Sequence, residues 1–298
     1  VVSAMHQYGD NGSFDIVVTV FDDDGSGMAS FTLTVDNVDP TATIDLSGTI
    51  LINGVPTVVA HVGDDISFSG DSTDPGSDDL TLSWDWGDGP PVPDESTTYW
   101  LIDSLNPDPL PSPSVDPRDV TDDQVHGFAE ACLYEVGFTS ADDDGGSDTD
   151  SLAVIIAGDG DLTRSAGYWY QAYHRQKNRP FPTAQLECFL DIAGFMSTVF
   201  NEETSAATVA EAADLLKGGG GPDMERIFDR QLLAAWLNFA NGAVDLDTMV
   251  DTDGDSAPDA SFAAIVGAAE AARLNPATTS SELEDHKNLL ELINVSSL

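Results

Sequence analysis

Basic residues are scarce in this chain of 298 residues. Ten lysines and arginines stand against 53 aspartates and glutamates, and the formal net charge at pH 7 is −43. In residues 1–163 the single basic residue, Arg118, accompanies 33 acidic ones. Because nucleic acids and anionic membranes bind proteins through Lys and Arg, we expect no nucleic-acid partner. The same acidity favours the binding of divalent cations.

Cysteine, long apolar runs and catalytic motifs are also lacking. The two cysteines, Cys132 and Cys188, fit either one disulfide or two buried small side chains. No apolar run approaches the ~20 residues that a membrane-spanning helix needs, so no membrane span is predicted. The sequence has no Gly-x-Ser-x-Gly, His-Glu-x-x-His or phosphate-binding glycine loop, and its five histidines show no ligand spacing. We therefore expect a protein that is not an enzyme.

Two stretches that lie 120 residues apart align without gaps. SFDIVVTVFDDDG at 13–25 corresponds to LYEVGFTSADDDG at 133–145. Each alternates apolar and polar residues up to an Asp-Asp-Asp-Gly turn, and a second alternating run follows at 31–35 or 151–156. This pattern is typical of an antiparallel hairpin. A repeat of this length with several short strands predicts tandem β-sandwiches.

The stretch LTLSWDWGDG at 80–89 carries two tryptophans directly before a glycine-rich turn. Leu80, Leu82, Trp84 and Trp86 alternate with polar residues, so all four share one strand face. Gly-Asp-Gly then supplies residues that tolerate a tight strand exit. The two indoles are therefore interpreted as core residues and not as part of a catalytic site.

These residues carry a family resemblance. WDWGDG, followed by LYEVGFTSADDDGG and DSLAVII, resembles the polycystic kidney disease (PKD) domain, whose usual motif has Phe where Trp86 stands. VDNVDPTATID at 35–45 is similar to the junctions in bacterial arrays of such domains. The resemblance covers residues 1–158 and implies tandem immunoglobulin-like β-sandwiches of bacterial or archaeal surface proteins.

The resemblance divides the chain into three predicted domains. Residues 1–38 match the C-terminal half of a PKD-like sandwich, 39–158 a complete one with a proline-rich insertion at 90–125, and 159–298 a helical domain. Half a sandwich has an exposed apolar face and unpaired edges, so we expect preceding sequence or another chain to supply the missing strands. The insertion holds 8 of the 16 prolines, and Tyr99 and Trp100 predict an ordered arm that packs on a partner.

Helical spacing replaces the period-2 pattern in the second half. Predicted helices cover residues 183–200, 208–216, 222–243, 261–274 and 279–295. Thr208 with Glu211, and Thr279 with Glu282, have the spacing of capping boxes. We expect five or six helices in one all-α bundle. This half resembles uncharacterised helical segments that follow PKD domains, and the resemblance implies no activity.

The sharpest candidate metal site is DTDGDSAPD. Asp251, Asp253, Asp255 and Asp259 occupy positions 1, 3, 5 and 9 of a calcium loop, although position 12 is Phe262 and not Glu. The alternative is an acidic, solvated loop that leads into a helix N-terminus. Weaker candidates, explained equally by solvated turns, are the acidic residues Asp22–Asp24, Asp71, Asp74, Asp78, Asp79 and Asp142–Asp144.

A cluster of basic and aromatic residues lies at 163–181. It includes Tyr168, Trp169, Arg175, Lys177 and Arg179. In so acidic a chain these residues fit either a hydrophobic core with local ion pairs or an interface with an acidic surface, of this chain or of a neighbour.

We therefore expect a non-enzymatic structural or adhesive protein at the cell surface or outside the cell. It would self-associate through β-strand complementation or head-to-tail contacts, with calcium as a stabilising ion. The alternative is the polysaccharide-binding accessory region of a larger secreted hydrolase, with Tyr99, Trp100 and Trp169 as the exposed aromatic platform.

Overall fold

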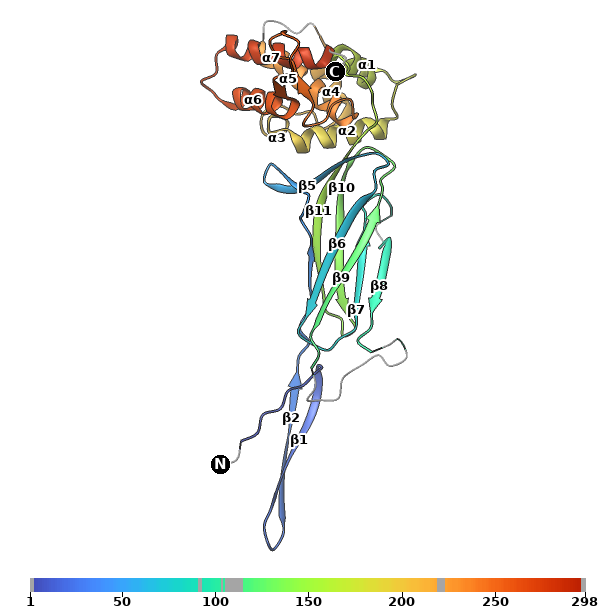
Figure 1. Cartoon of the computed structure of the whole chain (residues 1–298), viewed down its shortest axis with the longest axis vertical. Helices are drawn as coiled ribbons and strands as arrows, with labels where there is room; N and C mark the ends of the chain where they lie inside the picture. Colours follow the sequence, from blue (N-terminus) through green and yellow to red (C-terminus); the bar gives the residue numbers. More distant parts are fainter. Residues whose placement is uncertain (1–2, 91–92, 103, 105–114, 219–222, 296–298) are drawn as a thin grey trace. The chain divides into compact units, whose positions relative to one another are not determined.

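The computed structural model describes residues 3–90, 93–102, 104, 115–218 and 223–295 (Figure 1). Contacts between residues divide the chain into two compact units, which are treated separately below. The first comprises Val1–Ser47, Ser67–His126 and Glu135–Leu152, and the second Gly48–Ile66, Gly127–Tyr134 and Ala153–Leu298. The chain is multidomain, with β-sheet structure first and helices in its C-terminal half.

The first unit begins with a long hairpin. Strand β1 (Gly12–Phe21) pairs antiparallel with β2 (Ser26–Val35), with Phe14 opposite Leu33 and Val18 opposite Ala29. The chain reverses at the acidic turn, where Asp22 Oδ1 accepts hydrogen bonds from the backbone N–H groups of Asp24 (2.9 Å) and Gly25 (2.7 Å). The hairpin predicted from the alternation is therefore confirmed.

Two further sheets follow in the β-rich part. A three-stranded sheet has the order β3-β6-β9, and a six-stranded sheet has the order β4-β5-β11-β10-β7-β8. The strands are β3 (Thr41–Ile44), β4 (Ile50–Ile52), β5 (Val55–His61), β6 (Ile66–Asp74), β7 (Leu80–Asp85), β8 (Glu95–Tyr99), β9 (Arg118–His126), β10 (Leu133–Asp142) and β11 (Ser147–Ala157).

The proline-rich segment 90–125 contributes two of these strands. Strand β8 pairs with β7, and β9 lies beside β6 (Figure 1). The segment is thus not only the ordered arm expected from Tyr99 and Trp100, because both of its described ends are built into sheets. Residues 105–114 lie outside the described part of the chain.

The two tryptophans are core residues, as predicted. Trp84 and Trp86 are 0% and 3% exposed, and their rings stack with centroids 5.3 Å apart. Phe138 on β10 packs against Trp84 at 4.6 Å, and Phe68 on β6 contacts both indoles. The aromatic side chains therefore join residues of both sheets in one core.

The second unit contains all seven helices of the described chain, where five or six were expected. They are α1 (Ala166–His174), α2 (Thr183–Met196), α3 (Thr198–Glu202), α4 (Val209–Leu216), α5 (Met224–Ala240), α6 (Phe262–Leu274) and α7 (Ser280–Val295), with the short strands β12 (Met249–Val250) and β13 (Ala260–Ser261) between α5 and α6. No described helix is both long and apolar enough to cross a membrane.

Local sequence determines where several helices begin. The predicted capping box forms at α4, where Thr208 accepts from the Glu211 N–H and Glu211 accepts from Thr208. The same reciprocal bonds join Thr279 and Glu282 at the start of α7. Cys132 and Cys188 form a disulfide within this unit, which decides between the two alternatives left open by the sequence.

Candidate functional sites

The β1–β2 hairpin has free edges on both sides. Among the described residues these strands form a sheet of two, with no third strand beside either. Their counterparts 120 residues later are not free: β10 pairs with β7, and β11 pairs in parallel with β5. The two copies of the repeat therefore share a hairpin but differ in the strands around it.

One face of this hairpin is apolar and open. The register places Phe14, Ile16, Val18 and Val20 of β1 on one face, with Leu33, Phe31 and Ala29 of β2 across from them. Phe31 is 57% exposed and Val20 is 66% exposed. The opposite face is polar at the end away from the turn, with Ser13, Asp15 and Thr32, and carries the exposed side chains of Val17, Phe21 and Met28 nearer the turn. Adjacent apolar side chains that are this exposed are typical of a surface that binds another protein.

Tyr99 and Trp100, predicted to lie in an interface, have different environments. The Tyr99 hydroxyl donates to buried Asp122 at 2.5 Å, and Trp84 Nε1 donates to the same carboxylate at 2.8 Å. Burial, followed by the bond to Asp122, raises the pKa of Tyr99 to about 12. Tyr99 is therefore anchored inward, whereas Trp100 is 43% exposed and available to a partner.

Trp169 lies in the helical core. It is fully buried, its Nε1 donates to Asn238 Oδ1 at 3.1 Å, and its ring stacks on Phe181. Tyr168, one residue earlier, is half-buried beneath the Arg164 guanidinium. Helix α1 directs Trp169 into the core and leaves Tyr168 nearer the surface, so Trp169 has no exposed face that could stack on a sugar.

Three of the four lysines and arginines of this segment lie after α1. Arg175 and Lys177 are exposed, while Arg179 donates to Thr183 Oγ1 at 2.8 Å and to the Tyr173 carbonyl. Within the described chain none of the three forms an ion pair with an acidic side chain. Their charges are therefore available for an acidic partner.

The acidic loop after α5 gathers three of its four predicted ligands. Carboxylate oxygens of Asp251, Asp253 and Asp255 lie within 4.8 Å of one another. Asp259 instead accepts from the N–H and hydroxyl of Thr252. Backbone N–H groups already occupy both oxygens of Asp251. Burial is the largest single effect and would raise the pKa of Asp251, but the backbone hydrogen bonds together outweigh it and lower this pKa. The loop is thus organised by its own backbone.

A second acidic group is buried among the loops of the first unit. Oxygens of Asp74, Asp78 and Asp142 lie within 4.8 Å of one another, and the three residues are 2%, 5% and 8% exposed. Asp78 also belongs to a more exposed group with Asp10 and Asp144. Asp142 is distant in the sequence from Asp74 and Asp78, so the sequence pattern did not show the three as one group and favoured the Asp251 loop as a metal site.

The proximity of these carboxylates changes their acidity. Burial raises the pKa of Asp78 to about 7, and repulsion from Asp74 acts in the same direction. Burial also raises the pKa of Asp74, against the hydrogen bond from Gly76. For Asp144, burial is again the largest cause of a raised pKa, followed by repulsion from Asp10.

Comparison with known proteins gives weak matches. No protein family and no curated protein matches the sequence. The PKD domain of an M14-like peptidase from a Thermoplasmatales archaeon is 18% identical, with 41% of this chain and 98% of that chain covered and a TM-score of 0.26. A family 123 glycoside hydrolase from Clostridium perfringens is 11% identical, with 46% and 33% covered and a TM-score of 0.25.

A Salmonella alpha-2-macroglobulin mutant is 9% identical, with 78% of this chain but 18% of that chain covered and a TM-score of 0.26. This chain therefore spans about a third and about a fifth, respectively, of the hydrolase and the macroglobulin that it matches. TM-scores of this size carry no argument about fold or activity.

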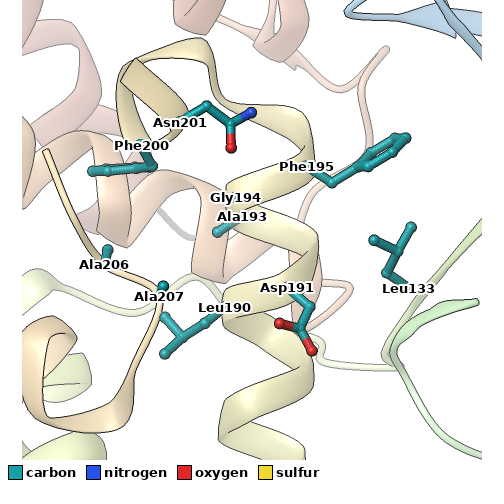
Figure 2. Close-up of a pocket in the computed structure, with 10 residues that line it drawn as sticks. All are labelled: Leu133, Leu190, Asp191, Ala193, Gly194, Phe195, Phe200, Asn201, Ala206 and Ala207. Atoms are coloured by element: carbon teal, nitrogen blue, oxygen red, sulfur yellow. The ribbon is translucent and has the colours of Figure 1, made fainter. Parts of the chain in front are cut away.

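The second unit has an open pocket of about 410 Å³ beside α2 (Figure 2). Its lining is mainly apolar, with Leu190 and Ala193 from α2 and Phe200 from α3. Asp191 is the one ionisable lining residue, and its pKa is raised first by burial and then by Glu187. A lone carboxyl group without a second acid, base or nucleophile in the lining gives no basis for assigning a reaction here.

Proposed function

We propose that this chain is a non-enzymatic structural or adhesive protein outside the cell, and that it self-associates by β-strand complementation at the β1–β2 hairpin. The observation that carries this proposal is the difference between the two copies of the repeat. The β10–β11 hairpin has strands on both edges, and the β1–β2 hairpin has none among the described residues.

The second copy indicates how the first would be completed. Phe138 on β10 pairs with Trp84, and Ser140 pairs with Leu82. Shifted by 120 residues, these positions of β10 are Val18 and Val20 of β1. An incoming antiparallel strand would therefore place its large apolar side chains opposite Val18 and Val20, over the apolar face of the hairpin.

The energetics favour such an addition. Unpaired strand edges offer backbone N–H and C=O groups to another strand, and isolated two-stranded hairpins are marginally stable in water. Covering each half-exposed Val, Leu or Phe side chain would contribute on the order of 1 kcal/mol. A second copy of the chain is the occupant that we propose, and the added strand would extend a β-sheet between copies.

The extracellular location is supported by the disulfide, since such bonds persist in oxidising compartments. We further interpret the β-rich part as tandem immunoglobulin-like domains of the PKD type, on the strength of the WDWGDG motif and the 120-residue repeat. The helices would form one interaction domain, with Arg175, Lys177 and Arg179 available to an acidic surface.

Sedimentation velocity of the full chain over a range of concentrations tests self-association. We expect concentration-dependent oligomers that Val18→Lys or Phe31→Lys weakens by roughly tenfold or more, because either change places a charge on the face to be covered. Thr32→Lys is the matched control: it adds the same charge next to Phe31 but on the opposite face, where its cross-strand neighbour is Asp15, and it should leave association unchanged. A native chain that stays monomeric throughout, or a control that dissociates equally, would refute the proposal.

A further inference from the structure

The buried carboxylates of the first unit lie where two loop segments meet. Asp74 ends β6, Asp78 lies in the connection to β7, and Asp142 ends β10. Each contributes an oxygen to a group less than 4.8 Å across, and each residue is more than nine-tenths buried. Three carboxylates from two segments distant in the sequence thus converge on one small volume that is shielded from water.

One oxygen of this group has no protein partner. Asp74 Oδ1 accepts from the Gly76 N–H at 2.6 Å, whereas Asp74 Oδ2 is buried and, among the described residues, accepts no hydrogen bond unless the neighbouring Asp78 carboxyl is protonated. Asp142 Oδ1 accepts from the N–H groups of Asp144 and Gly146, and Asp142 Oδ2 accepts one bond, from Asn37 Nδ2 at 2.7 Å, which leaves that oxygen able to bind a cation as well. A buried carboxylate oxygen without a partner costs free energy unless something else binds it.

No basic side chain neutralises the group. The charge of Arg118 has a small lowering effect on the pKa of Asp74, but none of the three aspartates has an ion-pair partner in the described chain. The Arg118 guanidinium donates instead to the Tyr99 carbonyl at 3.0 Å. When all three carboxyl groups are ionised, the group therefore carries excess negative charge in a buried place, which a cation would compensate.

Two glycines allow the carboxylates to approach. A Cβ built on Gly76 would overlap Asp78 Oδ2, and one on Gly146 would overlap Asp142 Oδ2. A cavity of about 140 Å³ beside the group is lined by Asp10, Asn11, Asn37 and Asp78 among others, which gives an ion and its water ligands a route of entry.

We propose that Asp74, Asp78 and Asp142 bind a divalent cation, and that this cation is calcium. The ligands are oxygen atoms of carboxylates, without His or Cys, which favours hard cations over zinc or copper. Calcium suits irregular loop ligands better than magnesium, which requires near-octahedral geometry. Because Asp78 also faces Asp10, the ion would fasten the segment before β1 to the loops of the β-sheets.

Calorimetric titration of the chelator-treated full chain with calcium chloride tests this site. We expect saturable binding that Asp78→Asn weakens by roughly tenfold or more through the loss of a charged ligand. Asp22→Asn is the control, since Asp22 is the repeat equivalent of Asp142 and likewise accepts from two backbone N–H groups of its turn, but belongs to no group of converging carboxylates among the described residues. Asp251→Asn should also leave this binding in place.

Thermal unfolding separates a metal ligand from a merely structural residue. Asp78→Asn removes repulsion, so its melting temperature without calcium should equal or exceed that of the native chain, while the rise on adding calcium should be lost. If Asp78→Asn does not fold, Asp74→Asn serves in its place. Absence of a calcium effect on the native chain, an unchanged effect in both variants, or its complete loss in Asp251→Asn would overturn the proposal.

Discussion

The Cys132–Cys188 disulfide predicts a large stability difference. The two cysteines are separated by 56 positions in the sequence, and the bridge joins the segment before β10 to helix α2 within the second unit. The perturbation is the double variant Cys132→Ala/Cys188→Ala, which removes the cross-link and leaves small apolar side chains in place.

The magnitude follows from the length of the closed loop. In the chain-entropy description, cross-linking a loop of nearly 60 residues destabilises the unfolded state by about 4 kcal/mol at 25 °C. The native geometry should persist in the variant, because Gln185 Nε2 still donates to the Ala131 carbonyl at 2.6 Å and the Ile156 N–H still donates to the Cys132 carbonyl at 2.9 Å. A loss of this size corresponds to roughly 8–16 °C in melting temperature for a unit of this length.

Urea unfolding monitored by tryptophan fluorescence measures the difference. We expect the double variant to unfold at lower urea concentration, and the native chain treated with a reducing agent to match it. The reducing agent should not affect the double variant, which serves as the control. A change below about 1 kcal/mol, or free thiols in the native chain, would refute the assignment of this bridge as a major stabilising element.

Two further predictions concern buried charges. In urea unfolding, Arg273→Met should lower the free energy of unfolding by about 3–5 kcal/mol, because it leaves the buried carboxylate of Asp229 without its charge partner, the guanidinium 2.8 Å away. Adding Asp229→Asn should restore part of this loss. A double variant that is as unstable as Arg273→Met would contradict this account. In the presence of chelator, the native chain should lose stability relative to Asp78→Asn as the pH rises from about 4 to about 7, measured by thermal melts. The reason is that Asp78 in the folded chain, with a pKa of about 7, keeps a proton that the unfolded chain releases near the ordinary pKa of 3.8. A stability difference that does not change or that rises with pH would contradict the raised pKa.

Local patterns predicted much of the secondary structure. The alternation that ends in Asp-Asp-Asp-Gly determines both hairpins of the repeat, and four of the five predicted helical segments contain one helix of nearly the expected extent. The fifth segment, 183–200, is divided at Ser197, whose extended backbone caps α3. Helix α1 was not predicted, because the aromatic and basic residues of this segment were interpreted as either a hydrophobic core or an interface, without a helix being assigned to them.

The sequence did not predict that Asp74, Asp78 and Asp142 form one group. Asp78 and Asp142 lie 64 positions apart, and only the adjacent placement of β7 and β10 brings their loops together. By contrast, the Asp251 loop is a local pattern, and its gathering of three oxygens follows from turns a few residues long. The proline-rich segment 90–125 was interpreted as an insertion, and its strands β8 and β9 were not predicted, because they depend on pairing with β7 and β6.

The repeat has a consequence for how assembly and ion binding would be coupled. The aspartates Asp22 and Asp142 both accept from two backbone N–H groups of their turns, but in the described chain the turn at Asp22 has no neighbouring loop that contributes carboxylates. If an incoming strand brought such loops to the β1–β2 hairpin, each completed hairpin would gain a cation site. Calcium would then promote association, association would raise the affinity for calcium by the same factor, and the number of ions bound would report the number of junctions formed.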